Sequence, residues 1–341
     1  MKVVEQPTGT KPTLKTIASM AGLAVPTVSR ALSDAPDIGA DTKALVRKIA
    51  REVGYVPNRA GVRLRTGRTN VISLVMSTEH DMMNHTARLI TSLAGGLRNT
   101  AFHMIVTPFF PDEDPMKAIR YIVETQSADA VVFNQVQPED PRVDYLMERG
   151  FPFAAHGRSN RASEHAYYDY DNHAFASLGV DALADRGRRS LILVAPPAAH
   201  AYSSHMKAGA TEQSAARGVD FRVVQRVDSD SGGEAIRAKV SEILKERPET
   251  DGIICGSTTG AMACVGAIEA NRRVLGQDID IFSKEALPFL RYFRRDIISV
   301  HENVAKAGDF LARAAMQAIK DPSAPPMQML EVPTKEQITQ G

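Results

Sequence analysis

The chain has 341 residues and nearly balanced charge, with 41 lysines and arginines against 40 aspartates and glutamates. This length is too great for one small domain and suits a small domain followed by two lobes. The start lacks the apolar core of a secretory signal, and no apolar run is long enough to span a bilayer. Cys255 and Cys264 show no metal-ligand spacing. We therefore expect a cytoplasmic protein with buried, reduced thiols.

The charge is unevenly distributed along the chain. Residues 1–70 contain 12 basic and 5 acidic side chains, a net charge of +7, and the remainder contains 29 and 35, a net charge of −6. A basic first fifth on an acidic body is typical of a domain that contacts phosphates.

The segment 14–32 predicts two short helices joined by a tight turn. Apolar residues recur at helical spacing in its first half, at Leu14, Ile17, Ala18 and Ala21. Gly22 follows directly, and glycine tolerates the left-handed backbone that ends a helix. The second half has its own apolar set at Val25, Val28 and Leu32, interleaved with the hydrogen-bonding Thr27, Ser29 and Arg30. Such a pair suits a DNA major groove, although an ordinary helical hairpin of a core has the same pattern.

A third helix is predicted over residues 41–53, followed by a basic segment. We expect its apolar face to consist of Ala44, Leu45, Ile49 and Val53, with cations elsewhere and Gly54 at its end. Residues 57–68 are rich in arginine, which suits either a segment that contacts DNA or a plain basic linker.

The motifs TVSRAL, GYVPN and LRTGRTN identify a family resemblance. Their order and spacing resemble those of the LacI (lactose/purine repressor) family of bacterial transcription regulators. The resemblance implies a flexible lead-in (1–12), a helix-turn-helix headpiece (13–56), a hinge helix (57–68) and a two-lobed effector-binding and dimerisation core (69–341).

The resemblance also implies which residues contact DNA. In the headpiece they are Thr16, Val25, Pro26, Thr27, Ser29 and Arg30, and in the hinge Asn58, Arg59, Arg63, Leu64 and Arg65. Arg30 can form bidentate hydrogen bonds with guanine, and Leu64 takes the position that wedges open a minor-groove step. Ala24 replaces the usual serine cap of the second helix, and Gly61 replaces the usual hinge alanine. We therefore expect a weakly capped recognition helix and a hinge that folds on DNA.

From residue 71 the pattern changes to alternating strands and helices. Short β-branched runs alternate with amphipathic segments, which predicts right-handed βαβ units and parallel sheets. The expected fold class is thus an all-α helix-turn-helix headpiece plus an α/β, two-lobed, periplasmic-binding-protein-like core. We expect the helix over residues 306–320 to return to the first lobe and QMLEVP to form a closing strand.

Ligands of parallel sheets bind beyond the carboxyl ends of the strands, so the polar residues there are candidates. They are Glu79, His80, Asn134, Gln135, His156, Arg158, Asp169, Asp171, His200, Tyr202, His205, Ser257, Thr258, Lys284, Glu285, His301, Glu302 and Asn303. Acids, amides and arginine suit the hydroxyls of a sugar, and Tyr167, Tyr168 and Tyr170 offer a flat face for its ring.

From these candidates we predict an effector-binding set. It consists of His80, Asn134, Arg158, Asp171, His205, Lys284 and Glu302. The family commonly has arginine at the position of Met206 and aspartate near Thr258, so we expect an effector that differs from the commonest family sugars. His205 or Lys284 would substitute for the missing arginine.

The sequence gives little support to catalysis. HExxH, GxSxG, GxGxxG and Walker-type motifs are absent from it. His80 with His85, or His200 with His205, could share a metal, but no further ligands are spaced to close a site, so we expect neither metal nor cofactor.

We predict a dimeric regulator, a repressor, that binds a pseudo-palindromic DNA operator and responds to a carbohydrate effector. A sugar-binding module for transport, without DNA binding, is the alternative. The sequence leaves open whether two dimers join into a tetramer and whether the effector is an inducer or a corepressor.

Overall fold

The computed structural model describes residues 11–56, 63, 67–78 and 83–339. The chain divides into two compact units, Met1–Thr69 and Asn70–Gly341, which are described separately below. No helix in these described ranges is long and apolar enough to cross a lipid bilayer.

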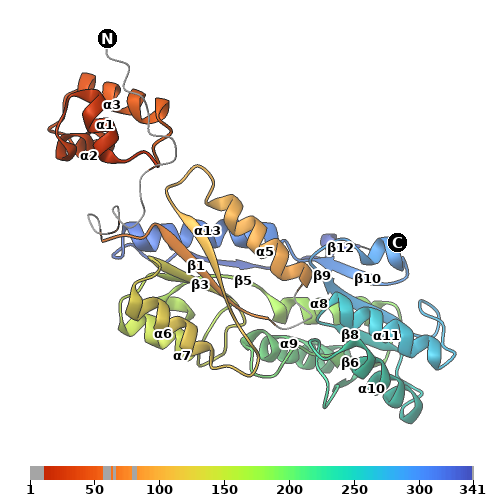
Figure 1. The fold of residues 1–341 in the computed structure, drawn as a ribbon. Coiled ribbons are helices and arrows are strands. Elements are labelled where there is room, and N and C mark those ends of the chain that lie inside the picture. Colours follow the sequence, from red (N-terminus) through yellow and green to blue (C-terminus); the bar gives the residue numbers. More distant parts are fainter. Residues whose placement is uncertain (1–10, 57–62, 64–66, 79–82, 340–341) are drawn as a thin grey trace. The chain divides into compact units, whose positions relative to one another are not determined.

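The first unit, the headpiece, is built from three helices around a small apolar core. These are α1 (Leu14–Ala21), α2 (Val25–Leu32) and α3 (Ala40–Glu52) (Figure 1). The buried core residues are Ile17, Ala18, Val28, Ala31, Val46, Ile49 and Ala50. Gly22 ends α1 with a φ of 67°, the left-handed conformation expected of it. Ala24 precedes α2 and gives its first turn no side-chain cap, as predicted.

The predicted apolar face of the third helix is wrong at Ala44 and Leu45, whereas Ile49 and Val53 do belong to it. Ala44 is exposed and Leu45 is 44% exposed, whereas Val46, Ile49 and Ala50 are buried. Val46, Ile49, Ala50 and Val53 stand at i, i+3, i+4 and i+7, whereas a face that starts at Leu45 would include Lys48. The helical period itself therefore indicates the face that is buried.

The second unit, the core, contains two six-stranded sheets. The first has the order β11-β5-β4-β3-β1-β2, and all its neighbouring strands are parallel. Its strands are β1 (Val71–Ser77), β2 (His103–Phe109), β3 (Ala130–Phe133), β4 (Phe153–His156), β5 (Ala166–Tyr170) and β11 (Gln328–Glu331). The second has the order β12-β10-β9-β8-β6-β7 and is parallel except for the pair β10–β12. Its strands are β6 (Ser190–Val194), β7 (Asp220–Val223), β8 (Gly252–Cys255), β9 (Asp280–Glu285), β10 (Ile298–His301) and β12 (Ile338–Thr339).

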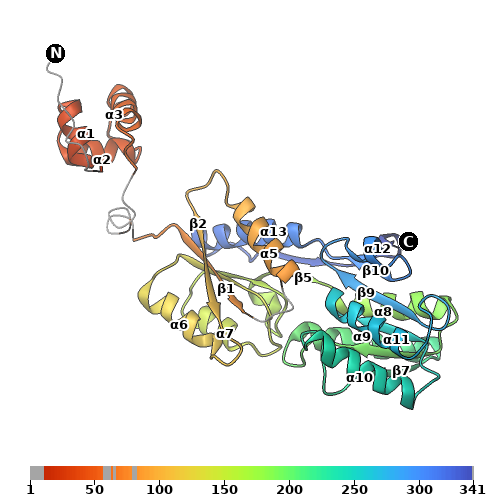
Figure 2. The ribbon, with the colours of Figure 1, turned by 45° about the vertical axis from the view of Figure 1, so that its right-hand side comes forward.

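Each sheet is covered by helices on both faces, and each sheet with its helices is one lobe. Around the first sheet lie α5 (Met83–Gly96) and α13 (Val304–Lys320) on one face, and α6 (Pro115–Thr125) and α7 (Pro141–Glu148) on the other (Figure 2). Around the second lie α8 (Asn172–Asp185) and α9 (Ala201–Arg217), and opposite them α10 (Gly233–Glu246) and α11 (Thr258–Ala270). The short α12 (Leu290–Phe293) belongs to this lobe too. Coverage of both faces explains why β1 is buried along its whole length. The fold class predicted from the sequence is confirmed.

The chain passes between the two lobes three times. It leaves the first sheet after β5 and enters α8, returns after β10 through α13, and leaves again after β11 to form β12. Helix α13 packs against α5 and the first sheet, so the predicted return of this helix is confirmed. Gly308 permits that close packing, because a Cβ at this position would overlap with Ser92 of α5.

Candidate functional site

The second helix of the headpiece presents its polar side chains away from the core. Val28 and Ala31 are buried, whereas Pro26 and Arg30 are exposed and Thr27 is half-buried. This division follows from the helical period, which places the hydrogen-bonding residues between the apolar ones. The exposed side of α2 can therefore donate and accept hydrogen bonds in a DNA groove.

An ion pair holds the candidate base-reading arginine. Nη2 of Arg30 lies 2.5 Å from Oδ2 of Asp37, and the two side chains are 58% and 47% exposed. An ion pair this exposed stabilises the fold by at most about 1 kcal/mol, so Arg30 can exchange it for a nucleic acid partner.

The other predicted DNA contacts have varied positions. Val25 and Ser29 are half-buried in α2. Thr16 belongs to the capping box of α1, where its side chain accepts a hydrogen bond from the Thr13 backbone. Arg63 is exposed, and the remaining hinge residues lie outside the described residues: Asn58, Arg59, Leu64 and Arg65.

The core contains a cavity of about 160 Å³ that is lined by residues of both lobes. The first lobe contributes His85, Asn134, Gln135, His156, Gly157, Asp169 and Tyr170. The second contributes Asn172, Pro196, Tyr202, Ser229, Asp230, Gly256, Ser257, Thr258, Thr259 and Lys284, while Ala286 and Glu302 complete the lining. Most of these residues follow the carboxyl ends of parallel strands, where open α/β sheets bind their ligands.

A charge pair between Lys284 and Glu302 lies at the wall of this cavity. Nζ of Lys284 is 2.9 Å from Oε2 of Glu302 and 3.1 Å from Oδ1 of Asn172. Burial on its own would raise the pKa of Glu302, but Lys284 and His85 hold it well below its usual value. Glu302 is thus a buried carboxylate that stays ionised because cationic and hydrogen-bonding groups surround it.

A second charge pair joins Arg158 and Asp169. Nε of Arg158 lies 2.7 Å from Oδ2 of Asp169. Burial raises the pKa of Asp169 to about 6, and the neighbouring Arg158 opposes that rise without cancelling it. Near neutral pH both charge pairs are internally compensated, which favours an uncharged ligand.

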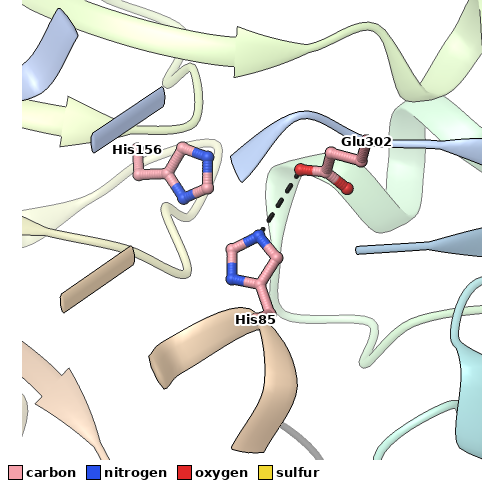
Figure 3. Close-up of side chains that lie close together, drawn as sticks. All are labelled: His85, His156 and Glu302. Atoms are coloured by element: carbon pink, nitrogen blue, oxygen red, sulfur yellow. Dashed lines mark hydrogen bonds and ion pairs between the residues drawn. The ribbon is translucent and has the colours of Figure 1, made fainter. Parts of the chain in front are cut away.

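Two histidines stack beside Glu302. The rings of His85 and His156 have centroids 5.1 Å apart, and Nε2 of His85 lies 3.4 Å from Oε1 of Glu302 (Figure 3). Burial, together with the nearby His85, lowers the pKa of His156 to about 3, so this imidazole is neutral near pH 7. Neutral imidazoles and a carboxylate can hydrogen-bond to hydroxyl groups or coordinate a cation.

Some polar atoms at the cavity have no partner within the described part of the chain. They are both amide atoms of Asn134, the Tyr170 hydroxyl and Nδ1 of His85. Leaving such buried groups unpaired is costly, and a polar ligand would satisfy them.

A buried arginine positions the backbone that carries Asn134. Arg142 donates to the carbonyls of Asn134 and Gln135 at 3.1 and 2.9 Å, and it pairs with Asp140 at 2.7 Å. Its guanidinium also lies over the Phe133 ring, 4.4 Å from the centroid. This network fixes the loop after β3 at the cavity wall.

The structure brings together part of the predicted effector set. Asn134, Lys284 and Glu302 line the cavity, and Arg158 reaches it through its partner Asp169. His80 lies outside the described residues.

Two further members of the predicted set lie outside the lining, Asp171 and His205. Asp171 caps α8 by accepting a hydrogen bond from the Ala174 backbone at 3.1 Å. His205 lies in α9, half-buried, and its neighbour Met206 packs in the second lobe's apolar core.

The predicted tyrosine face was wrong for two of its three members. Tyr168 is fully buried in one apolar core of the first lobe, and Tyr167 packs against the other. Tyr170 does line the cavity. All three belong to β5, whose alternating side chains point to opposite faces and cannot form one flat surface.

The comparisons with known proteins agree with this architecture. Residues 13–58 match the family described as bacterial regulatory proteins, lacI family, and residues 180–340 match the periplasmic binding protein-like domain. The HTH-type transcriptional regulator AglR of Rhizobium meliloti (strain 1021) is 28% identical over 323 residues, covering 93% of this chain and 90% of AglR.

Solved structures show the same fold over almost the whole chain. The transcriptional regulator CelR–cellobiose complex has a TM-score of 0.69 and 22% identity, covering 94% of this chain and 97% of that one. The lac repressor dimer bound to operator and the anti-inducer ONPF has a TM-score of 0.80 and 16% identity, covering 97% and 98%.

Proposed function

Because this chain belongs to the LacI family of bacterial regulatory proteins, we propose that it represses transcription under the control of a neutral carbohydrate. The headpiece would read operator DNA, and the cavity of the core would hold the effector. The protein would act in the cytoplasm, as a regulator without catalytic activity.

One observation carries the carbohydrate proposal. The cavity combines unpaired buried amide and hydroxyl atoms of Asn134 and Tyr170 with two internally compensated charge pairs. A sugar offers many uncharged donors and acceptors, whereas a carboxylate or phosphate ligand would disturb that balance of charge. The structure of the related CelR in complex with cellobiose is consistent with a neutral sugar as the ligand.

Binding would affect DNA affinity through the arrangement of the lobes. The cavity is lined from both lobes, so a ligand can favour one arrangement of them over another. A shift of β1, which begins at Val71 shortly after the segment 57–68, would change the spacing of two hinges in a dimer. The hinge roles of Arg59, Leu64 and Arg65 remain predictions.

A homodimer is supported by the exposed edge of the first sheet. Strand β2 is the last strand of that sheet, and Ile105 and Val106 on it are 47% and 37% exposed. Phe110, just after β2, is 60% exposed. An apolar edge strand invites pairing, so we propose that a second copy of the chain covers it.

The test is an operator titration with the full-length chain at fixed salt. Promoter fragments from the protein's own locus would be titrated with and without a panel of neutral mono- and disaccharides, with sugar acids and sugar phosphates as charged comparators. We expect a neutral sugar to change operator affinity by about 5- to 150-fold, in either direction. Sugar binding without binding to any DNA would instead support the transport-type module, and a response to charged sugars alone would overturn the neutral-ligand proposal.

A further inference from the structure

His85, His156 and Glu302 come from three separate parts of the core and converge at the cavity (Figure 3). His85 lies on α5, His156 ends β4, and Glu302 directly follows β10. Each offers one ligand atom, and these atoms all lie within 4.8 Å of one another. We propose that these three side chains hold a divalent transition-metal ion of the zinc class.

The spacing of the ligand atoms fits such an ion. Metal bonds of about 2.0–2.2 Å in a tetrahedral site put neighbouring ligand atoms about 3.3 Å apart. Nε2 of His85 and Oε1 of Glu302 are already 3.4 Å apart. The other pairs of ligand atoms lie within 4.8 Å, so they have to close by at most about 1.5 Å when the metal binds.

The carboxylate has one oxygen to spare for a metal. Oε2 of Glu302 is held at 2.9 Å by Lys284, whereas Oε1 faces His85 at 3.4 Å, which is long for a hydrogen bond. The Glu302 side chain is only 6% exposed, so water satisfies this oxygen poorly. A buried carboxylate held by so long a contact favours a stronger partner.

The donor set determines which metal would bind. Two imidazoles and one carboxylate suit zinc, cobalt or nickel, whereas calcium and magnesium prefer oxygen ligands. All three side chains line the cavity, so the fourth position would face its interior. A ligand hydroxyl could occupy that position, a consequence that rests on the proposed function of the cavity, whereas the metal site itself does not.

Lys284 would tune the affinity of the site. Its ammonium group forms an ion pair with the Glu302 carboxylate at 2.9 Å and would repel a second cation nearby. Removal of the Lys284 charge should therefore strengthen metal binding. The loss of a merely structural contact would weaken metal binding or leave it unchanged.

The experiment uses the untagged full-length chain, stripped with a chelator and titrated with Co²⁺ and then Zn²⁺. We expect one equivalent of Co²⁺ with the visible spectrum of four-coordinate cobalt, bleached by Zn²⁺. His85→Ala, His156→Ala and Glu302→Gln should each weaken binding at least tenfold, and Lys284→Gln should strengthen it several-fold. His103→Ala and His173→Ala, which lie outside the cluster, are the matched controls.

Several results would overturn the proposal. One is the absence of stoichiometric cobalt uptake, and another is unchanged uptake in variants of the cluster that retain the circular dichroism of the parent chain. Operator binding and a sugar response without metal uptake would remove the metal site while leaving the proposed function intact. Metal uptake by a chain that binds no DNA would support the metal site and overturn the proposed function.

Discussion

The headpiece and the ligand cavity use polar side chains in opposite ways. In the headpiece a small apolar core carries the fold, and the candidate reading residue Arg30 is exposed and only loosely paired. In the cavity Glu302 and Asp169 are buried, and their ion pairs with Lys284 and Arg158 are part of the packing. Substitution in the headpiece should therefore change recognition with little effect on stability, whereas substitution around the cavity should change both.

The largest expected effect is a loss of stability when a buried ion pair of the core is broken. Asp140→Ala leaves Arg142 buried without its carboxylate, so we expect the free energy of unfolding to fall by about 3–5 kcal/mol. The loop that carries Asn134 should loosen as well, because Arg142 holds its backbone carbonyls. Urea unfolding of the full-length chain measures the loss. Asp144→Ala, in the helix that Asp140 caps and with a side chain 49% exposed, is the control and should cost less than about 1 kcal/mol.

The matching change in the headpiece should alter specificity instead. Arg30→Ala should lower the discrimination between operator and scrambled duplex by about 1–3 kcal/mol, because one bidentate base contact would be lost. The exposed Arg30 contributes little to folding, so the unfolding transition should stay within about 0.5 kcal/mol of the parent.

Fluorescence anisotropy at fixed salt measures this discrimination. Lys48→Ala, an exposed cation of α3 paired with Glu52, is the control for a general loss of positive charge. Equal losses of affinity on both duplexes in Arg30→Ala would contradict a base-reading role and leave only a phosphate contact.

Acidification should weaken the core through His200, which is half-buried and neutral near pH 7. Burial, aided by the nearby Arg142, lowers the pKa of His200 to about 4, whereas the unfolded chain titrates near 6.5. Below pH 6.5 the unfolded state therefore binds the additional proton, and stability falls as the pH drops from about 6.5 towards 4.

One such histidine contributes a slope of at most about 1.4 kcal/mol per pH unit. His200→Gln should flatten the dependence of the unfolding free energy on pH, and the exposed His103→Gln should leave it unchanged. An equally steep dependence in both variants would assign the acid sensitivity to other groups.

The smallest expected effect is a gain in the stability of the headpiece. Ala24→Ser supplies the hydroxyl that α2 lacks at its first turn, which should stabilise the headpiece by about 1 kcal/mol. Slower hydrogen exchange of the amides of α2 would report the gain. Ala24→Val has no oxygen to accept a hydrogen bond and should give no protection.

The sequence predicts the fold well because both of its patterns are local. Helical spacing in the headpiece and strand–helix alternation in the core depend on near neighbours, so three helices and most strands were predicted. Strand β5 was missed because its residues, AYYDY, mix aromatic and polar side chains in place of a β-branched run. Strand β10, with the residues ISVH, was also not predicted, although its pattern is that of a short buried strand. Strand β12 has two residues and exists through its pairing with β10, which no local pattern indicates.

The ligand cavity was less predictable, because it depends on which neighbouring side chain faces inward. The end-of-strand rule identified Asn134, Lys284 and Glu302 but could not separate Asp169, which lines the cavity, from Asp171, which caps a helix. His85 reaches the cavity from a helix, and Ser229 and Asp230 reach it from the connection after β7. Their positions depend on long-range packing, for which a single sequence carries no local signal.

The connections between the lobes have one more consequence. Tyr170 and Asn172 flank the first passage of the chain, and Glu302 stands at the start of the second. A molecule bound by these side chains therefore lies at the pivot between the two lobes and not at their outer edges. The displacement of a rigid lobe grows with distance from its rotation axis. A small rotation of one lobe about this pivot therefore produces a larger displacement at the outer ends of both sheets.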